Sequence, residues 1–409
     1  MLPKTSPLSC IHPYPGMVAD ELAMQLAGEF VIEEGRWILD PFVGTGRFLA
    51  AAGVFGGRGI GFDINPLAII IANAKASRPA LPALRKLYTH VEMAVDLASY
   101  RGRKMFIDRK VEWFPKRTLV ELQYLVDCLN AYGVPNDAHY LIGAILSATA
   151  RQVSYCRKDQ WKLHRLSESH RQLHQKSAFP IFLGRLQSAI RTLEGLPKSP
   201  PLFRALFCDS RRLQNESFRR IPGNQVDLIL TSPPYGDSRT TVQYGGMSEL
   251  CLDVISKLDF LKDFCGDYKG IDRACLGGIL PHSPCCTQLR KGIWGGDIHG
   301  VPGRRLISFL ADLEASCVSS LARLKVGGKA VFVVSRRSID GRTLKLDKWL
   351  IDLFYENNCD LLDLRVRRLQ RKIAPFLIRP KARSNDQDLR NLLVRTMREE
   401  YILIFQKRS

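Results

Sequence analysis

The sequence predicts an α/β protein, in which short apolar strands alternate with amphipathic helices. Residues 36–39 are strand-like and run into Asp40, and residues 59–62 are strand-like and end at Asp63. An apolar segment with helical spacing follows each of them. A third strand-like run, residues 226–230, ends in a polar loop. Because ligands of open α/β sheets bind at the carboxyl ends of strands, we expect a functional site there.

The loop after residues 226–230 contains Ser232, Pro233, Pro234 and Tyr235. The two prolines fix their φ angles and lack an N–H group, so their carbonyl groups can only accept hydrogen bonds. Tyr235 adds an aromatic face with a polar tip. The tetrapeptide alone is common in surface turns, and it is the strand before it that favours a binding site.

A glycine-rich loop follows the first strand, with Gly44 and Gly46 allowing a tight turn beside the acceptor Asp40. Asp63 lies where nucleotide-binding βαβ units hold a pair of ribose hydroxyls. The dinucleotide fingerprint is incomplete, because its third glycine position is Leu49. The pattern therefore favours a nucleoside ligand without phosphates, and S-adenosylmethionine is such a ligand.

The remaining elements continue this alternation. Asn65 and Pro66 are placed as the N-cap and first residue of a helix, and Asp209 is a third acid at a strand end. Further elements are predicted as a helix after the turn at 12–16, an amphipathic helix over 306–324 stopped by Gly327 and Gly328, a strand over 329–334, a helix from 346, and strands over 361–366 and 401–405.

The domain organisation follows from where this alternation is interrupted. Residues 1–79 and 205–409 are predicted to form one α/β domain, and residues 80–204 a basic helical insertion. Residues 237–303 have weak periodicity and are expected to form a long loop or small subdomain over the site.

Basic and aromatic side chains alternate within the insertion, a combination that suits a nucleic-acid backbone with stacking rings. These residues are Arg151, Tyr155, Arg157, Lys158, Trp161, Lys162, Arg165, Arg171 and Lys176. A solvated helix face would explain the same charges. The insertion is a candidate DNA-binding or target-recognition region, and both interpretations stay open.

The whole chain of 409 residues carries a formal charge of +20 and has a pI near 9.6, which suggests a polyanionic partner such as nucleic acid or an anionic membrane surface. No run of 18 apolar residues is present, so no membrane span is predicted. The first residues lack the apolar core of a signal peptide, which favours a cytoplasmic protein. The eleven cysteines include no C-x-x-C pair, and neither a metal site nor a disulfide framework is predicted.

Five segments together resemble the S-adenosylmethionine-dependent DNA amino-methyltransferases, most closely the N4-cytosine class of restriction-modification systems. These segments are HPYPG (12–16), DPFVGTG (40–46), FDINP (62–66), TSPPYGD (231–237) and TMREEYILIF (396–405). The resemblance covers nearly the whole chain. It implies a class I methyltransferase fold, with a Rossmann-like, mixed seven-stranded sheet, helices on both faces and a final antiparallel hairpin.

The resemblance also implies roles for individual residues. The α/β domain would bind S-adenosylmethionine. Asp40, Phe42, Gly44 and Gly46 would hold its methionine part, Asp63 the ribose, and Asp209 the adenine edge. Tyr14, Pro15, Thr45 and Ile64 are further cofactor candidates on the same motifs, and Ser232, Pro233, Pro234 and Tyr235 would hold the target base.

The expected reaction transfers a methyl group to the N4 amino group of a cytosine flipped out of double-stranded DNA. Ser232 would act as a hydrogen-bond acceptor and not as a covalent nucleophile, since no neighbouring His or Lys would activate it. Methylation of cytosine C5 would need a catalytic cysteine, for which only Cys285 was a local candidate.

Three alternatives stay open at this point: an N6-adenine DNA methyltransferase, an RNA amino-methyltransferase, and a catalytically silent nucleic-acid-binding protein of the same fold. Whether a cognate restriction endonuclease acts on the same site also stays open.

Overall fold

The computed structural model of the protein describes residues 8–31, 33–94, 111–157, 163–197, 200–236, 243–265, 268–278, 293–296, 299–339, 342–369, 377–378, 394–395 and 399–409. The chain divides into two compact units. Unit 1 comprises residues 1–34, 43–207 and 243–271, and unit 2 comprises residues 35–42, 208–242 and 272–409.

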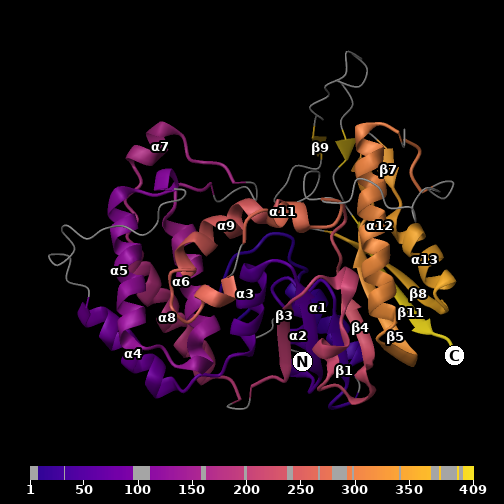
Figure 1. Ribbon diagram of the computed structural model, residues 1–409, viewed down its shortest axis with the longest axis horizontal. Coiled ribbons are helices and arrows are strands. Elements are labelled where there is room, and N and C mark those ends of the chain that lie inside the picture. Colours follow the sequence, from indigo (N-terminus) through magenta and orange to yellow (C-terminus); the bar gives the residue numbers. More distant parts are fainter. Residues whose placement is uncertain are drawn as a thin grey trace. The chain divides into compact units, whose positions relative to one another are not determined.

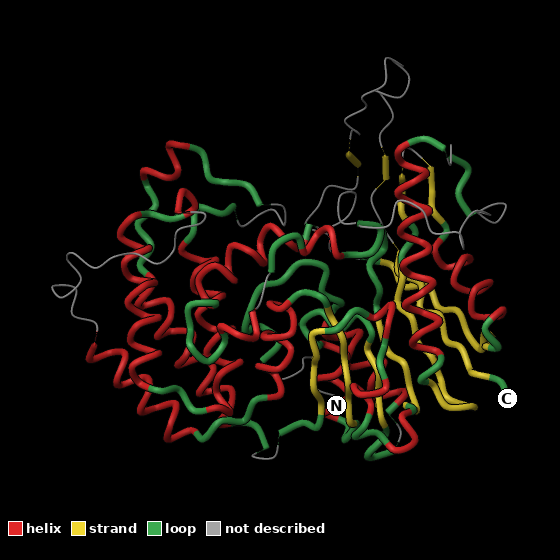
Figure 2. The backbone as a smooth tube through the Cα atoms, viewed as in Figure 1, coloured by secondary structure: helices red, strands yellow, loops and turns green. Residues whose placement is uncertain are grey.

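A seven-stranded mixed sheet with the strand order β3-β2-β1-β4-β5-β11-β8 forms the centre of the fold (Figures 1 and 2). Its strands are β1 (Trp37–Asp40), β2 (Arg58–Asp63), β3 (Phe203–Phe207), β4 (Val226–Thr231), β5 (Leu324–Val334), β8 (Cys359–Arg368) and β11 (Glu399–Lys407). The pairs β2 with β3, β1 with β4 and β4 with β5 are parallel, and β11 runs antiparallel to both β5 and β8. The predicted Rossmann-like, seven-stranded sheet with flanking helices is confirmed.

Two small antiparallel pairs complete the described strands. They are β6 (Arg337–Ile339) with β7 (Arg342–Leu344), and β9 (Leu377–Ile378) with β10 (Val394–Arg395).

Unit 1 contains most of the helices, and all of them except α10 are labelled in Figure 1. They are α1 (Asp20–Phe30), α2 (Arg47–Val54), α3 (Pro66–Ala76), α4 (Leu81–Ala94), α5 (Lys116–Tyr132), α6 (His139–Val153), α7 (Glu168–Gln172), α8 (Ala178–Glu194), α9 (Tyr244–Ile255) and α10 (Lys262–Cys265), with short 3-10 turns at Val111–Trp113 and Asn136–Ala138. The predicted cap of α3 is confirmed: the Asn65 side chain accepts a hydrogen bond from the Leu67 N–H, and Pro66 is the first helical residue.

Unit 2 contains the helices α12 (Val301–Leu321) and α13 (Leu346–Glu356), and the 3-10 turns η4 (Ser210–Arg212), η5 (Asn215–Phe218) and η6 (Pro222–Asn224). The short helix α11 (Ile271–Ala274) crosses the boundary between the units. Phe354 of α13 packs on Phe332 of β5 and on Phe405 of β11, with ring centroids 4.9 and 4.2 Å apart. These aromatic contacts fix α13 on the β5–β11 part of the sheet.

One predicted boundary is wrong. Gly327 and Gly328 do not stop the helix, which ends at Leu321, but lie inside β5. Gly327 has a φ of +76°, and the pairing of β4 with β5 shifts its register from Leu324 to Lys329. The two glycines therefore allow an irregularity within the strand.

Both interrupted regions contain helices. Residues 80–204 were predicted to be helical, and α6 of this segment has 11 buried residues out of 15. Helix α9 lies in the 237–303 segment, which was expected to form a long loop or small subdomain, and nine of its 12 residues are buried. A helix buried on most sides shows little polar face, so its pattern in the sequence is weak. The predicted insertion limit at residue 204 falls inside β3, because Phe203 already pairs with Gly59.

Within the described residues, no helix has the length and apolar character needed to cross a membrane.

Candidate active site

The glycine loop of unit 1 is closely packed on α3. Gly44 and Gly46 have φ angles of +48° and +72°, as the tight turn requires. A Cβ atom at Gly46 would lie 2.9 Å from the Cβ of Ala72, so only glycine fits. The hydroxyl of Thr45 lies 3.4 Å from the amine of Lys75, which is buried. Burial and the nearby charge of Arg47 lower the pKa of Lys75 to about 7.

Asp63 ends β2 and binds backbone groups on both sides. One carboxylate oxygen accepts the Gly44 N–H at 3.0 Å, and the other accepts the Asn65 N–H at 2.8 Å. Burial raises the pKa of Asp63 to about 6, although hydrogen bonds from Asn65, Gly44 and Ile64 oppose this rise. The structure thus brings the predicted Asp63 and Gly44 into direct contact.

Asn65 links the predicted cofactor residue Tyr14 to helix α9. Its amide nitrogen donates to the Tyr14 hydroxyl and to the Ser248 hydroxyl, both at 2.7 Å. Tyr14 and its neighbour Pro15 are buried, whereas Ile64 is half-buried. The sequence predicted the capping role of Asn65 but not these two contacts.

Helices α6 and α8 hold the segment before Tyr14. The ring of buried His12 hydrogen-bonds to the Ser147 hydroxyl at 2.9 Å, and Arg151 donates to the Pro13 carbonyl oxygen at 3.2 Å. Arg185 donates to the carbonyl oxygen of Ile11 at 3.4 Å. Burial, together with the charge of Arg151, lowers the pKa of His12 to about 3, so its ring is neutral at pH 7.

In unit 2, the buried Asp40 joins the ends of two strands. One of its carboxylate oxygens accepts the Thr231 hydroxyl at 2.6 Å and the Phe42 N–H at 3.2 Å. The first bond ties β1 to β4 immediately before Ser232. Asp40 therefore has a structural task that the sequence did not predict, besides any contact with a cofactor.

Residues 232–235, here called the SPPY loop, follow β4. The loop brings Ser232 and Tyr235 together, with 3.1 Å between their hydroxyl oxygens. Burial and the nearby charge of Glu400 raise the pKa of Tyr235, whereas the hydrogen bond with Ser232 and the charge of Arg367 lower it. Tyr235 is thus a neutral phenol at pH 7. Pro233 is buried and Pro234 half-buried between them. Asp237, the last residue of the predicted motif, lies outside the described residues.

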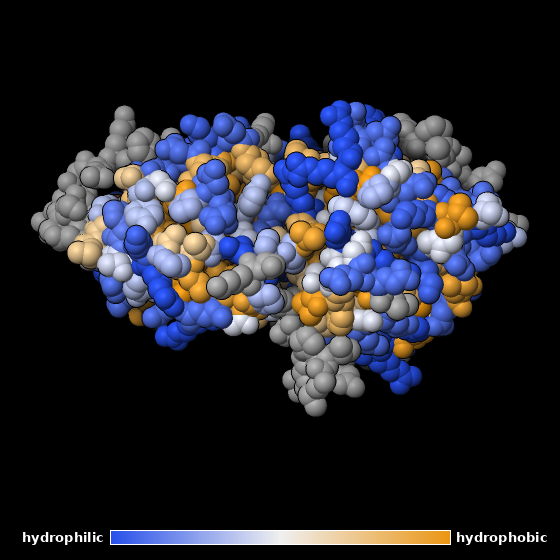
Figure 3. Space-filling view, turned by 90° about the horizontal axis from the view of Figure 1, so that it is seen from below, coloured by the Kyte–Doolittle hydropathy of each residue, from blue (hydrophilic) through white to orange (hydrophobic). Residues whose placement is uncertain are grey.

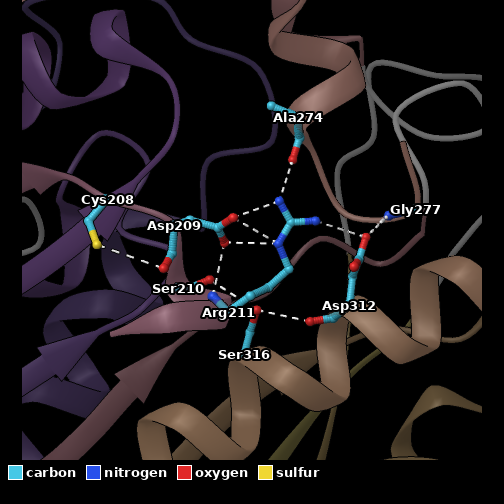
Figure 4. A network of polar contacts seen from close by, with 8 residues as sticks. All are labelled: Cys208, Asp209, Ser210, Arg211, Ala274, Gly277, Asp312 and Ser316. Atoms are coloured by element: carbon cyan, nitrogen blue, oxygen red, sulfur yellow. Dashed lines mark hydrogen bonds and ion pairs between the residues drawn. The ribbon is translucent and has the colours of Figure 1, made fainter. Parts of the chain in front are cut away.

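Asp209 follows β3 and is bound by a nearby guanidinium group (Figure 4). Arg211 Nε lies 2.9 Å from both Asp209 carboxylate oxygens, and its Nη2 lies 2.7 Å from Oδ2. The same guanidinium reaches the Asp312 carboxylate at 3.1 Å and the Ala274 carbonyl oxygen at 3.1 Å. The Asp209 side chain remains 38% exposed, so part of its carboxylate is accessible to a ligand.

The sequence did not indicate several contacts of these sites. Asn65 was expected only as a helix cap and not as a link between Tyr14 and α9, and Lys75, Arg211 and Asp312 were not among the candidate residues. Lys75 alone left a local signal, because it is the single charged residue in the mainly apolar segment LAIIIANAKA (67–76). Arg211 and Asp312 are distant in sequence, and no local pattern joins them.

Within the described residues, no three His, Cys, Asp or Glu side chains are grouped so that they could hold a metal ion. Cys285, the candidate for C5 methylation, lies outside that part.

Part of the predicted nucleic-acid surface is described in unit 1. Arg165 lies over the ring of Trp113 at 5.5 Å, and Arg171 over Tyr155 at 6.0 Å. Lys158, Trp161 and Lys162 lie outside the described residues. On the face drawn in Figure 3, hydrophilic residues are spread widely, with smaller groups of hydrophobic residues among them.

No family model matches the chain. The chain is similar to the Type II methyltransferase M.MvaI of Kocuria varians, with 24% identity over 97% of this chain and 90% of that protein. It is 25% identical to the Type II methyltransferase M.BsoBI of Geobacillus stearothermophilus over 53% of this chain and 47% of that one. A tRNA (guanine(10)-N2)-dimethyltransferase of Methanocaldococcus jannaschii is 42% identical over 52 residues, which are 13% of this chain and 15% of that one.

Among solved structures, TrmN from Thermus thermophilus matches 96% of this chain and 50% of its own, with a TM-score of 0.31 and 11% identity. The rRNA methyltransferase aviRa from Streptomyces viridochromogenes matches 81% of this chain and 86% of its own, with a TM-score of 0.29 and 13% identity. The sequence similarity to M.MvaI, which extends along nearly the whole of both chains, supports a methyltransferase.

Proposed function

We propose that the protein is a site-specific DNA methyltransferase that transfers a methyl group from S-adenosylmethionine to the N4 amino group of a flipped cytosine. The observation that carries this proposal is the SPPY loop, in which the hydroxyl groups of Ser232 and Tyr235 lie 3.1 Å apart directly after β4. Its place in a chain similar to a Type II methyltransferase supports the same conclusion.

The chemistry of an aromatic amine explains why this loop suits the reaction. The lone pair of the amino nitrogen is delocalised into the ring, so a site must favour the pyramidal geometry reached in the transition state. Ser232 Oγ and the Pro233 carbonyl oxygen are the acceptors for the two amino hydrogens. If the Ser232 proton is donated to Tyr235, both lone pairs of Ser232 Oγ stay available to accept. The neutral phenol of Tyr235 permits this arrangement.

Cofactor roles are proposed for residues of each unit by itself. In unit 1, Gly44, Thr45 and Gly46 provide a backbone turn for the methionine part of the cofactor. In unit 2, Asp40 and Phe42 are assigned to the same part. Asp63 provides a carboxylate for the ribose, and Asp209 one for the adenine edge. Tyr14, Pro15 and Ile64 complete the set. The bound cofactor supplies an electrophilic methyl group on a sulfonium, and the protein residues orient the amine towards it.

The partner is double-stranded DNA, because the net charge of +20 and the cation–aromatic pairs of unit 1 suit a phosphate backbone. A duplex hides the amino group, so the base must leave the stack, and the Tyr235 ring can then stack on it. Such an enzyme acts in the cytoplasm, with a cognate restriction endonuclease as its natural companion.

A second candidate is an RNA amino-methyltransferase. The 52-residue similarity to a tRNA (guanine(10)-N2)-dimethyltransferase favours it, since guanine N2 is also an exocyclic amino nitrogen. That match covers a small part of both chains, whereas the similarity to M.MvaI covers nearly all of both.

Nucleoside mass spectrometry tests the proposal. DNA and total RNA are incubated with the protein and S-adenosylmethionine, then digested, and 4-methylcytosine in DNA is the expected product. N6-methyladenine or 5-methylcytosine in its place would overturn the base assignment, and methylation of RNA alone would support the second candidate.

Three variants test the loop. Ser232→Ala should lower kcat roughly 100-fold, by loss of a transition-state hydrogen bond of the strength found in oxyanion holes. Tyr235→Phe keeps the ring and should lower the activity less than Tyr235→Ala, because the second variant also loses stacking on the base worth about 1–3 kcal/mol. Tyr355→Phe is the matched control, because Tyr355 is exposed. Full activity in Ser232→Ala would contradict the mechanism.

A further inference from the structure

We infer that Arg211 is a positioning residue, which orients Asp209 for an adenine amino group and couples that contact to residues 274–277 through Asp312. The inference rests on the proposed function, since it assigns the adenine edge of the cofactor to Asp209. It concerns unit 2 alone, and its contacts are drawn in Figure 4.

The first step concerns the orientation of the Asp209 carboxylate. Arg211 donates to it from Nε, from Nη2 and from its backbone N–H, which lies 3.0 Å from Oδ1. A two-pronged guanidinium contact fixes the plane of a carboxylate as well as its position. The exposed side of that carboxylate can then accept a hydrogen bond in one defined direction.

The second step concerns charge. The guanidinium of Arg211 is 12% exposed and lies between two carboxylates, of which Asp312 is 1% exposed. Oδ1 of Asp312 is buried and has no hydrogen-bond partner among the described residues. With both acids ionised, the three groups carry a net charge of −1. This surplus favours a hydrogen-bond donor such as an adenine amino group over an acceptor such as a purine carbonyl group.

The third step concerns the connection to residues 274–277. Arg211 Nη2 donates to the Ala274 carbonyl oxygen at 3.1 Å, and Asp312 Oδ2 accepts the Gly277 N–H at 2.7 Å. Both ends of this segment therefore depend on the same ion pair. A ligand that stabilises the Asp209–Arg211 contact also stabilises the segment, and such coupling acts equally in both directions.

The main experiment compares two probes by calorimetry: S-adenosylhomocysteine, and its inosine analogue, in which a carbonyl oxygen replaces the adenine amino group. The wild-type protein should prefer the first by about 100-fold, because a site built to bind a donor rejects an analogue without it. Arg211→Gln should reduce this preference about tenfold, whereas Arg211→Lys should keep part of it. General structural damage would weaken the binding of both ligands equally and leave the ratio of their affinities unchanged.

Arg212→Gln is the matched control, because it removes the same charge one residue later from an exposed side chain. The ratio of its affinities for the two probes should equal that of the wild type. Hydrogen exchange provides the second measurement: S-adenosylhomocysteine should slow exchange at residues 274–277 in the wild type, and Asp312→Asn should abolish most of this effect.

The outcomes separate the inference from the proposed function. If Asp209→Asn removes the preference for adenine while Arg211→Gln keeps it, the positioning role is wrong and the adenine assignment stands. If neither Asp209→Asn nor Arg211→Gln changes the ratio, the adenine assignment itself fails. If S-adenosylhomocysteine does not bind the wild type, the proposed function fails. Unchanged exchange at 274–277 on ligand binding would overturn the coupling.

Discussion

Asp63 and Asp209 carry the same signal in the sequence, an acid at the end of a parallel strand, yet their surroundings differ. Asp63 in unit 1 is held by backbone N–H groups, and burial raises its pKa to about 6. Asp209 in unit 2 is half exposed and bound to the guanidinium of Arg211. The backbone donors around Asp63 do not offset its burial, so this carboxylate is sensitive to protonation near neutral pH. Asp209 instead has a cation as its partner. Substitutions of these two acids, which share a position at a strand end, should therefore have different effects.

The largest effect should come from Asp63→Ala. The change removes the acceptor for the ribose and leaves the Gly44 and Asn65 N–H groups without their carboxylate. Charged hydrogen bonds of about 1.5–3 kcal/mol each imply a loss of affinity for S-adenosylhomocysteine of roughly 100-fold or more. Calorimetry measures it, with Asp259→Ala on the exposed surface as the control. An unchanged affinity would remove Asp63 from the cofactor site.

Arg211→Gln should have the next largest effect, on the free energy of unfolding. It leaves the buried Asp312 without its cation, which typically costs 3–5 kcal/mol for a fully buried pair. Because Asp209 is half exposed and solvent screens its share, we expect about 2 kcal/mol. Urea denaturation measures the change, and Arg212→Gln should lie within about 0.5 kcal/mol of the wild type. Equal stability of these two variants would show that the guanidinium is not holding Asp312.

The smallest effect should be the pH dependence of cofactor affinity. Asp63 has a pKa raised to about 6, so it is ionised above that pH. Only the ionised form has the acceptor capacity that the proposed contact with the ribose hydroxyls requires. Below pH 6 a proton occupies the carboxylate, and the affinity should fall by up to tenfold per pH unit. Titrations between pH 5 and pH 8 measure this slope. Asp63→Asn should bind weakly with no such slope, and a wild-type slope that persists in this variant would assign the titration to another group.

The sequence was informative where local chemistry decides the structure. Apolar runs ending in Asp40 and Asp63 located two strands, and Asn65 with Pro66 located the start of α3. The loop conformations at Gly44 and Gly46 were also predictable, because only glycine adopts a positive φ without cost. The seven-stranded sheet was predicted only through the resemblance.

Other features depend on contacts between distant segments, and no local pattern contains them. The bond of Asp40 to Thr231 joins residues 191 positions apart. Helix α9 was expected as a loop or small subdomain, because burial on most sides removes the polar face that a pattern needs. Gly327 was misread because glycine ends helices and also permits irregular strands. The division of residues 80–204 from the catalytic domain, and their role in target recognition, stay predictions.

The support that α6 and α8 give to residues 11–14 has a consequence for protein engineering. Residues 80–204 are the predicted target-recognition region, and a graft of the whole region would be the simplest design for exchanging that specificity. Here excision of 80–204 would delete Ser147 and Arg151, which bind His12 and Pro13 of the HPYPG segment, and Arg185, which binds the preceding Ile11. A chimera that keeps α6 and α8 and replaces only the stretch between them would preserve these anchors. The segment that could be exchanged without loss of these contacts is therefore much shorter than residues 80–204.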